Sequence, residues 1–266
     1  VSDPDEIDGE SISELIQDEI SLIDDIDVGG YHGSATQKIG SKKWRLESDS
    51  SLSHGGLELI SPPLKISEAA AIIKKVFAFI NEYGKTDSST GLHVHMSVKG
   101  KKMSSLDQVK MLLLIDEGEI YNLFPERKEN RFTHSMTSYI SGKLNGRKDG
   151  AIREEDVEGA LNKTLRGTKF NPGKYFGVNF SFLGDDRIEY RYLGGTSYHR
   201  KYDAVIRQIG TFADILLAGL DEKYRRKEYV QKILRIKEGI DEGASIARLD
   251  TTVQRALNIH SNISIE

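Results

Sequence analysis

The chain has 266 residues, of which 38% are hydrophobic and 29% charged, and its formal net charge is −4. This length can bury a substantial core in one large or two small domains. The weak negative charge gives no reason to expect binding to nucleic acid or to an anionic membrane surface. No apolar run approaches the roughly 20 residues that a membrane span requires.

Cysteine is absent, which excludes disulfides, thiolate metal sites and cysteine nucleophiles. Any metal site must therefore use histidine, carboxylates and water, and these ligands favour hard cations or zinc. The acidic N-terminal residues lack the basic and then apolar pattern of a secretory signal. We therefore expect a cytoplasmic protein.

The first elements alternate between helix and strand. Isoleucine and leucine recur at helical spacing over residues 8–26, which predicts an acidic amphipathic helix. Residues 27–42 are rich in glycine and serine and are predicted as loop. Two strands, "KWRLES" and "GGLELIS", follow with the turn-type cluster "DSSLSH" between them. A helix capped by Ser67 is predicted to run to Tyr83.

The remaining elements begin with a strand, "TGLHVHMSV". One helix is predicted over residues 105–124 and a short one over 153–166. "GKYFGVNFSFL", the turn "GDD" and "RIEYRYLGG" predict an antiparallel hairpin with alternating faces. Helices over residues 198–220 and 222–237 complete the prediction.

Prominent hairpins with only partial alternation of strand and helix predict an α+β fold, in which an antiparallel-rich curved sheet has helices packed on one face. We divide the chain into three parts. These are an acidic N-terminal helix and loop (1–40), a central domain (41–221) and a C-terminal helical extension (222–266).

Two histidines stand two residues apart in the strand "TGLHVHMSV". Residues i and i+2 of a strand share a face, so His93 and His95 project together, and Ser97 continues the polar row. An isolated H-x-H is by default one exposed and one satisfied histidine, although the pattern also occurs in zinc and iron sites. Gly91 would allow a ligand or backbone to approach closely. The polar row of His93, His95 and Ser97 is therefore predicted to line the floor of a functional site.

Two further strands carry charged residues. Glu58 lies between two leucines. Its carboxylate either faces water, or it is buried and a cation or hydrogen bonds offset the free-energy cost of burial. Glu189 and Arg191 share a face and follow Arg187. Alone they would form a minor surface ion pair. Beside a metal and a phosphate donor, the carboxylate would hold a divalent cation and the guanidinium would bind phosphoryl or carboxylate oxygens.

The loop "ERKENR" adds Arg127 and Arg131, which form either a second anion clamp or a solvated charge run. No single cluster is decisive. Three strands that each present polar residues on one face, in the order Glu, H-x-H and E-x-R, predict a common site.

Together, "WRLESDSSLSHGGLELISPPL", "TGLHVHMSV" and "IEYRYLGGT" resemble the motifs of the amidoligase family, a branch of the glutamine synthetase and glutamate–cysteine ligase superfamily. The resemblance runs from about Trp44 to Thr196. It implies a glutamine-synthetase-like catalytic domain whose concave sheet binds ATP and divalent ions, Mg²⁺ or Mn²⁺. ATP would phosphorylate a small-molecule or peptide carboxylate, and ammonia or an amine would then displace phosphate from the acyl phosphate.

The resemblance also implies roles for individual residues. The metal ligands would be Glu58, His93 and Glu189, the cofactor-binding residues His95 and Arg191, and the catalytic residues Glu189, Arg131 and Arg191. Ser97, which continues the polar row, and Arg187, which precedes Glu189, are predicted from their positions to bind the cofactor as well. Asp49 matches the acid of the family's D-x-S-L turn. The acyl phosphate must be shielded from water, so a mobile loop is expected, either "GGYHGS" or residues 141–151.

One feature departs from the family, which opens with a strand carrying an E-x-E pair. No such triplet precedes Trp44. Either Glu10, Glu14 or Glu19 substitutes, or the segment is missing from this chain, or the metal site is degraded.

Two alternatives to a ligase remain. In the first, a degraded ligase domain serves as a structural or interaction module that binds protein partners through its terminal helices, including the basic residues 224–237. The missing E-x-E pair favours this alternative, whereas the retained Glu58, His93, Glu189 and Arg191 favour the ligase. A zinc hydrolase built on the two histidines is weaker, because H-E-x-x-H spacing is absent.

Overall fold

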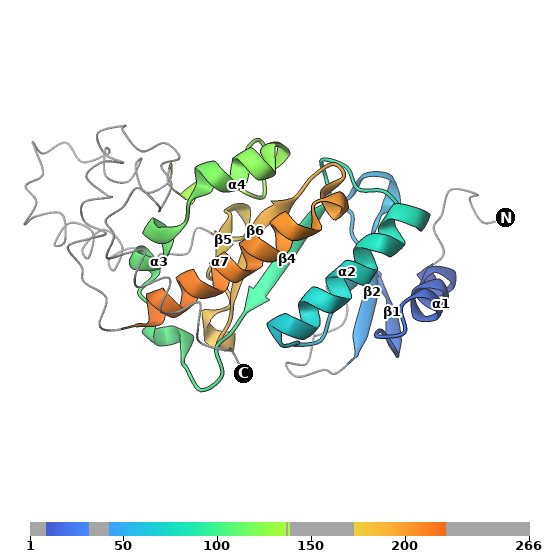
Figure 1. The fold of residues 1–266 in the computed structure, drawn as a ribbon, viewed down its shortest axis with the longest axis horizontal. Coiled ribbons are helices and arrows are strands. Elements are labelled where there is room, and N and C mark those ends of the chain that lie inside the picture. Colours follow the sequence, from blue (N-terminus) through green and yellow to red (C-terminus); the bar gives the residue numbers. More distant parts are fainter. Residues whose placement is uncertain (1–8, 32–42, 137, 139–172, 222–266) are drawn as a thin grey trace, which may run out of the picture. The chain divides into compact units, whose positions relative to one another are not determined.

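The computed structural model describes residues 9–31, 43–136, 138 and 173–221, which belong to two compact units (Figure 1). The first unit contains the described residues up to Thr90 together with Gly195–Asp203, and the second contains those of Gly91–Gly194 and from Ala204 onward. The predicted helices over 153–166 and 222–237, the loop 141–151 and the extension 222–266 lie outside the described residues. The predicted domain boundaries stay predictions.

Sheet A of the first unit has the strand order β1-β2-β3. It is formed by β1 (Ile26–Tyr31), β2 (Trp44–Ser48) and β3 (Leu57–Ile60). β2 and β3 are antiparallel, as predicted, whereas β1 pairs in parallel with β2. The predicted loop over 27–42 is therefore wrong for its first residues, because the edge of β2 pairs with them.

Two helices cover one face of sheet A, α1 (Gly9–Glu19) and α2 (Ile66–Tyr83). Their apolar side chains, those of β2 and two isoleucines that follow α1 form the core of this unit, whose buried members are Ile16, Ile20, Ile23, Trp44, Leu46 and Ile72. α1 ends earlier than predicted. α2 begins one residue before the predicted cap, and the Glu68 carboxylate accepts a hydrogen bond from the Lys65 N–H at 3.2 Å.

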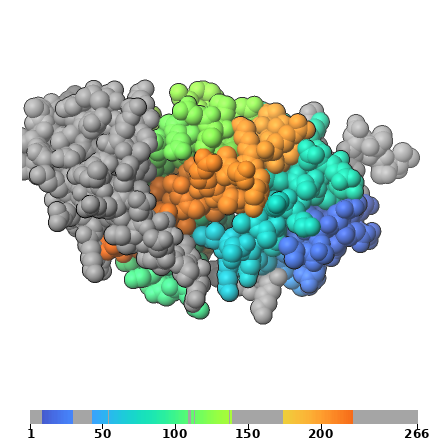
Figure 2. All heavy atoms as spheres, viewed as in Figure 1, coloured from blue at the N-terminus to red at the C-terminus, as the bar shows by residue number. Residues whose placement is uncertain are grey.

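Sheet B of the second unit is antiparallel and has the strand order β4-β6-β5. Its strands are β4 (Gly91–Met96), β5 (Val178–Asn179) and β6 (Ile188–Gly194), so the predicted hairpin is confirmed. The helix α7 (Tyr202–Leu220) runs across one face of this sheet (Figure 1). In the space-filling view the orange atoms of α7 lie on the face toward the viewer (Figure 2).

The contact between α7 and sheet B is aromatic. The Tyr190 ring stacks on Phe212 with a centroid distance of 4.2 Å and an interplanar angle of 4°. The Tyr190 hydroxyl donates to the Phe212 carbonyl at 3.0 Å. This pairing buries the α7 side of β6 and leaves its other face for polar groups.

The single helix predicted over residues 105–124 is wrong. The structure has two helices, α3 (Gln108–Leu114) and α4 (Glu117–Leu123). Asp116 separates them, because its carboxylate accepts the Glu119 N–H at 3.0 Å and so caps a new helix.

The described residues thus form an α+β fold with small, mainly antiparallel sheets. The sequence predicts one curved sheet, whereas the described residues form two three-stranded sheets. None of the helices in the described part of the chain is long and apolar enough to cross a membrane.

Candidate functional site

β6 places its polar residues on the face of sheet B that is opposite α7. Ile188, Tyr190 and Tyr192 are fully buried. Glu189 and Arg191 alternate with them and therefore project to the other face, as the sequence predicts.

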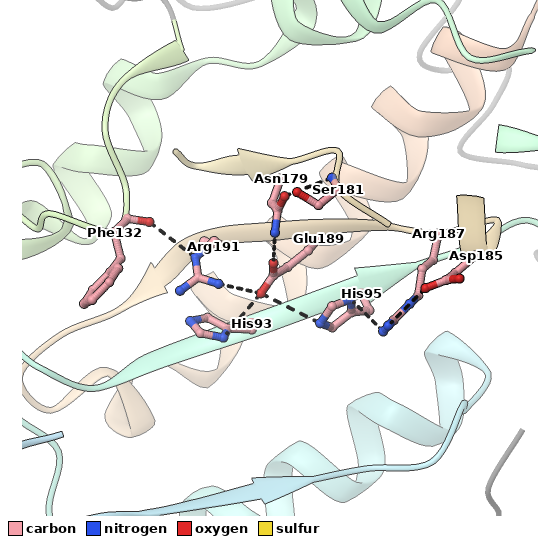
Figure 3. A network of polar contacts seen from close by, with 9 residues as sticks. All are labelled: His93, His95, Phe132, Asn179, Ser181, Asp185, Arg187, Glu189 and Arg191. Carbon is pink, nitrogen blue, oxygen red and sulfur yellow. Dashed lines mark hydrogen bonds and ion pairs between the residues drawn. The ribbon is translucent and has the colours of Figure 1, made fainter. Parts of the chain in front are cut away.

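Glu189 is the centre of a polar network on this face (Figure 3). Its side chain is only 4% exposed. Oε1 lies 2.8 Å from Arg191 Nη1, and Oε2 accepts a hydrogen bond from Asn179 Nδ2 at 2.7 Å. His93 Nδ1 lies 3.4 Å and His95 Nε2 3.8 Å from Oε1. All three strands of sheet B thus contribute to one cluster.

Strand register explains why these side chains meet. Glu189 pairs directly with His95 on β4 and with Asn179 on β5. Directly opposed residues of an antiparallel pair lie on the same face, about 5 Å apart. The register shifts between Leu92 and Val94, and His93 still reaches Glu189 across this irregularity.

Asn179 is a site residue that the sequence reasoning missed. It is 2% exposed and binds Glu189 through its amide nitrogen and the Ser181 N–H through its amide oxygen at 3.0 Å. The available signal was its place between two apolar residues, Val178 and Phe180, in the strand that precedes the E-x-R strand.

One end of the network contains Arg187, His95 and Phe182. Arg187 Nη1 lies 3.2 Å from His95 Nδ1, and its guanidinium carbon lies 4.2 Å from the centroid of the Phe182 ring. Because a guanidinium can only donate, Nδ1 accepts and Nε2 carries the ring proton. Burial lowers the pKa of His95, and the charges of Arg187 and Arg191 act in the same direction against that of Glu189.

Arg127 is buried and so does not belong to a solvated charge run, while its predicted part in a second anion clamp stays a prediction. It is 2% exposed and donates from Nη2 to the Arg191 carbonyl at 2.8 Å, so it supports β6 from within the protein. A Cβ added at Gly91 would lie 3.2 Å from both this Nη2 and His93 Nε2. The space beside Gly91 is thus filled by the chain's own side chains.

Arg131, in contrast, is exposed, and its guanidinium carbon lies 4.6 Å from the centroid of the Phe132 ring. Ser97 follows the end of β4 and is also exposed. The roles predicted for Arg131 and Ser97 stay predictions.

Glu58 lies in the first unit, on β3 of sheet A. It pairs directly with Glu47 of β2, and both project away from the helix-covered face, whose core includes Leu57 and Leu59. Glu47 is 3% exposed and forms an ion pair with Arg45. The sequence reasoning missed it, and the metal-binding role predicted for Glu58 stays a prediction.

The neighbouring parts of sheet A differ from the expected family pattern. β1, "IDVGGY", carries no E-x-E pair, and a Cβ added at Gly29 would lie 3.4 Å from Glu47 Cγ. Asp49 has a local role, because its carboxylate accepts the Ser51 N–H at 2.8 Å in the turn that follows β2.

The donors of sheet B have the chemistry that a hard or borderline divalent ion requires. His93 and Glu189 place an imidazole nitrogen 3.4 Å from a carboxylate oxygen. Within the described ranges no group of three or more His, Asp or Glu side chains is arranged to hold a metal ion. Mg²⁺ often takes only one or two protein ligands, because water and substrate phosphates supply the others. The metal-binding roles predicted for His93 and Glu189 stay predictions.

The fold and this network define an α+β protein with a carboxylate–imidazole–guanidinium site on one sheet. A family model described as "Putative amidoligase enzyme" matches residues 10–209. The chain therefore belongs to the amidoligase family, as its motifs predict. No curated protein and no solved structure matches the chain significantly.

Proposed function

We propose that the chain is an ATP-dependent carboxylate–amine ligase that acts through an acyl phosphate and has a glutamine-synthetase-like catalytic domain. The observation that carries this proposal is the network on sheet B, where one buried carboxylate contacts two imidazoles and a guanidinium. Membership of the amidoligase family supports the same reaction class.

The charges of this network suit phosphoryl transfer to a carboxylate. Both reactants are anions, so the reaction needs concentrated positive charge and accurate positioning more than a protein nucleophile. Arg187 and Arg191 flank Glu189 in the sequence of β6 and its preceding turn. Guanidinium groups bind phosphoryl and carboxylate oxygens in bidentate fashion.

Arg191 retains donors for this task. It uses Nη1 for Glu189 and Nε for the Phe132 carbonyl at 3.3 Å. A guanidinium has five N–H donors, so the others can bind a substrate oxygen while these two contacts hold the side chain in place.

The divalent ion would be Mg²⁺ or Mn²⁺, held by His93 and Glu189. When bound, it would neutralise charge on the transferring phosphoryl group. Asn179 would keep the Glu189 carboxylate oriented, since its amide already binds Oε2.

The proposal is tested by the binding of the non-hydrolysable ATP analogue AMP-PNP, measured calorimetrically with and without Mn²⁺. We expect Mn²⁺-dependent binding that Glu189→Gln and His93→Ala each weaken at least about 100-fold, since even outer-shell partners of metal ligands contribute about 10- to 100-fold. His93→Ala should leave thermal unfolding nearly unchanged, whereas Glu189→Gln also removes the buried ion pair with Arg191, so its binding is measured below its unfolding temperature. Glu119→Gln, an exposed acid on α4, is the matched control and should bind normally.

A chemical test addresses the intermediate. Hydroxylamine attacks an acyl phosphate to give a hydroxamate and inorganic phosphate, so ATP consumption with a mixture of carboxylates and hydroxylamine should yield both products. Failure of the wild-type chain to bind AMP-PNP with either Mg²⁺ or Mn²⁺ would overturn the proposed ligase function. It would favour the alternative, a protein-interaction module.

A further inference from the structure

Arg127 carries a guanidinium into the interior of the second unit. It is 2% exposed and ends the short 3₁₀ helix Pro125–Arg127 that follows α4. Burying a guanidinium costs free energy unless hydrogen bonds compensate for the lost water, and an apolar side chain would fill the same space without this cost. The contacts that Arg127 makes therefore indicate its role.

The side chain of Arg127 reaches the two longer strands of sheet B. On β6, the Arg191 carbonyl accepts a hydrogen bond from Arg127 Nη2 at 2.8 Å. On β4, the same Nη2 and His93 Nε2 each lie 3.2 Å from the position that a Cβ at Gly91 would take. The guanidinium of Arg127 thus lies beside both strands, where Gly91 leaves room for it.

The backbone of Arg127 closes the turn that holds the other end of Arg191. The Arg127 carbonyl accepts the Thr133 hydroxyl and, at 3.3 Å, the Asn130 N–H. Within this turn Asn130 Oδ1 accepts the Phe132 N–H at 2.9 Å. The Phe132 carbonyl then accepts Arg191 Nε at 3.3 Å (Figure 3). One buried residue is thus linked to both ends of Arg191, directly to its carbonyl and through the turn to its guanidinium.

These contacts decide how the Arg191 guanidinium is oriented. Its contact with Glu189 fixes Nη1, and the contact at Nε fixes the plane of the group. Bidentate binding of an oxyanion depends on that plane. The turn is also fixed to α4, because the Tyr121 hydroxyl donates to the carbonyl of the buried Thr133 at 2.9 Å. The guanidinium is therefore oriented before any ligand arrives, which removes the cost of reorganising it.

We propose that Arg127 is a positioning residue, which holds the Arg191 guanidinium in the orientation that binds phosphoryl oxygens of the nucleotide. In this assignment Arg127 itself touches no ligand, since its side chain is buried and bonded to the Arg191 carbonyl. Its effect on binding passes through Arg191. The assignment rests on the proposed ligase function and adds to it a residue outside the network.

The first measurement follows the guanidinium itself and needs no ligand. In NMR spectra of the isotope-labelled chain, the Nε–H of Arg191 is identified by its loss in Arg191→Lys, and its exchange with water is slowed by the bond to Phe132. We expect Arg127→Met to speed this exchange at least about 10-fold, the effect of losing roughly one hydrogen bond. Tyr190→Phe is the matched control. It removes a buried hydrogen bond of β6 on the α7 side and should leave the exchange unchanged.

The second measurement is a double-mutant cycle on the binding of AMP-PNP with Mn²⁺, made below the unfolding temperature of every variant. We expect Arg127→Met to weaken binding about 10-fold when Arg191 is present and to have no effect in Arg191→Met, because its effect passes through Arg191. Tyr190→Phe should bind like the wild-type chain. A residue that only stabilises the fold would change neither the exchange nor the affinity under these conditions.

Unchanged exchange in Arg127→Met, or affinity equal to that of a wild-type chain that binds AMP-PNP, would overturn the positioning role. An equal loss of affinity with and without Arg191 would assign Arg127 to the ligand itself, as an anion clamp, and overturn it too. Faster exchange when even the wild-type chain binds no AMP-PNP would retain the orientation of Arg191 by Arg127 and remove the ligase function instead. If Arg127→Met does not fold, Thr133→Val decides, since it removes the hydroxyl bonded to the Arg127 carbonyl and should speed the exchange likewise.

Discussion

The central strands of the two sheets carry the same charged pair in opposite order. β2 of sheet A has Arg45 followed by Glu47, and β6 of sheet B has Glu189 followed by Arg191. In both sheets the pair spans i and i+2, forms an ion pair and includes a glutamate whose side chain is 4% exposed. A buried Glu–Arg pair alone therefore does not distinguish a candidate site from ordinary structure.

The neighbouring strands make the difference. Glu47 pairs with Gly29 on one side and with Glu58 on the other, so sheet A offers it no imidazole or amide from these positions. Glu189 pairs with His95 and Asn179, which bring a ring and an amide donor to its oxygens. Residues one strand away thus give sheet B its candidate chemistry.

The largest expected effect is a loss of stability at Gly177, where the absence of a side chain leaves room for the Tyr192 ring of β6. A Cβ at Gly177 would overlap the ring of Tyr192, which is buried and donates its hydroxyl to Glu117 at 2.8 Å. Gly177→Ala should cost at least about 3 kcal/mol of unfolding free energy, because the packed ring must move. Urea unfolding followed by circular dichroism, with hydrogen exchange of β6, measures the loss.

The control for that substitution lies in sheet A. At Gly29 an added Cβ would meet nothing closer than Glu47 Cγ at 3.4 Å, an ordinary contact. Gly29→Ala should therefore change the free energy of unfolding by less than about 1 kcal/mol. Equal stability of the two variants would mean that the Tyr192 ring has room to move.

Two substitutions with smaller expected effects compare how the carboxylates of Glu47 and Glu189 are held in place. Arg45→Met removes this cation from the buried Glu47 and should cost about 3 kcal/mol. Asn179→Ala removes one donor from Glu189 but leaves Arg191, so the cost should be about 2 kcal/mol. Trp44 fluorescence reports unfolding of the first unit, and hydrogen exchange of β6 reports the second.

The control is Arg207→Met, which removes an exposed guanidinium on α7 and should change stability by less than about 0.5 kcal/mol. A loss from Arg45→Met no greater than this control would show that the ion pair of sheet A contributes nothing to stability.

The alternation of polar and apolar residues along a strand, with a period of two, explains which part of the candidate site the sequence could predict. It identifies the faces of β4 and β6, and so brings His93, His95, Glu189 and Arg191 to one side of sheet B. It cannot show which strands pair, because pairing depends on residues distant in the sequence. For that reason the sequence does not reveal that Glu58 belongs to a separate sheet.

The wrong predictions share a physical cause, since tertiary contacts override local composition. β1 contains two adjacent glycines and an aspartate, which disfavour a strand, yet β2 pairs with it. Asp116 ends one helix and caps the next, although the surrounding periodicity is continuous. Arg127 stands in a charged run that is typical of a solvated loop, and only the fold buries it against the Arg191 carbonyl.

The smallest expected effect is a pH dependence in the first unit. His199 is 7% exposed, and its Nδ1 lies 3.0 Å from Thr86 Oγ1. Burial lowers the pKa of His199, and the charge of Arg200 adds to this. The unfolded chain takes up the proton near pH 6.5, before the folded chain does. Stability should therefore fall as the pH drops below that value.

His199→Gln should flatten this dependence when Trp44 fluorescence follows urea unfolding between about pH 7.5 and pH 5.5. His134→Gln, which removes an exposed ring in the second unit, should leave the slope of the first unit unchanged. An unaltered slope in His199→Gln would mean that other groups cause the pH dependence. A flattened slope would separate this buried histidine, which serves the fold, from the histidines beside Glu189, to which we assign a role in binding.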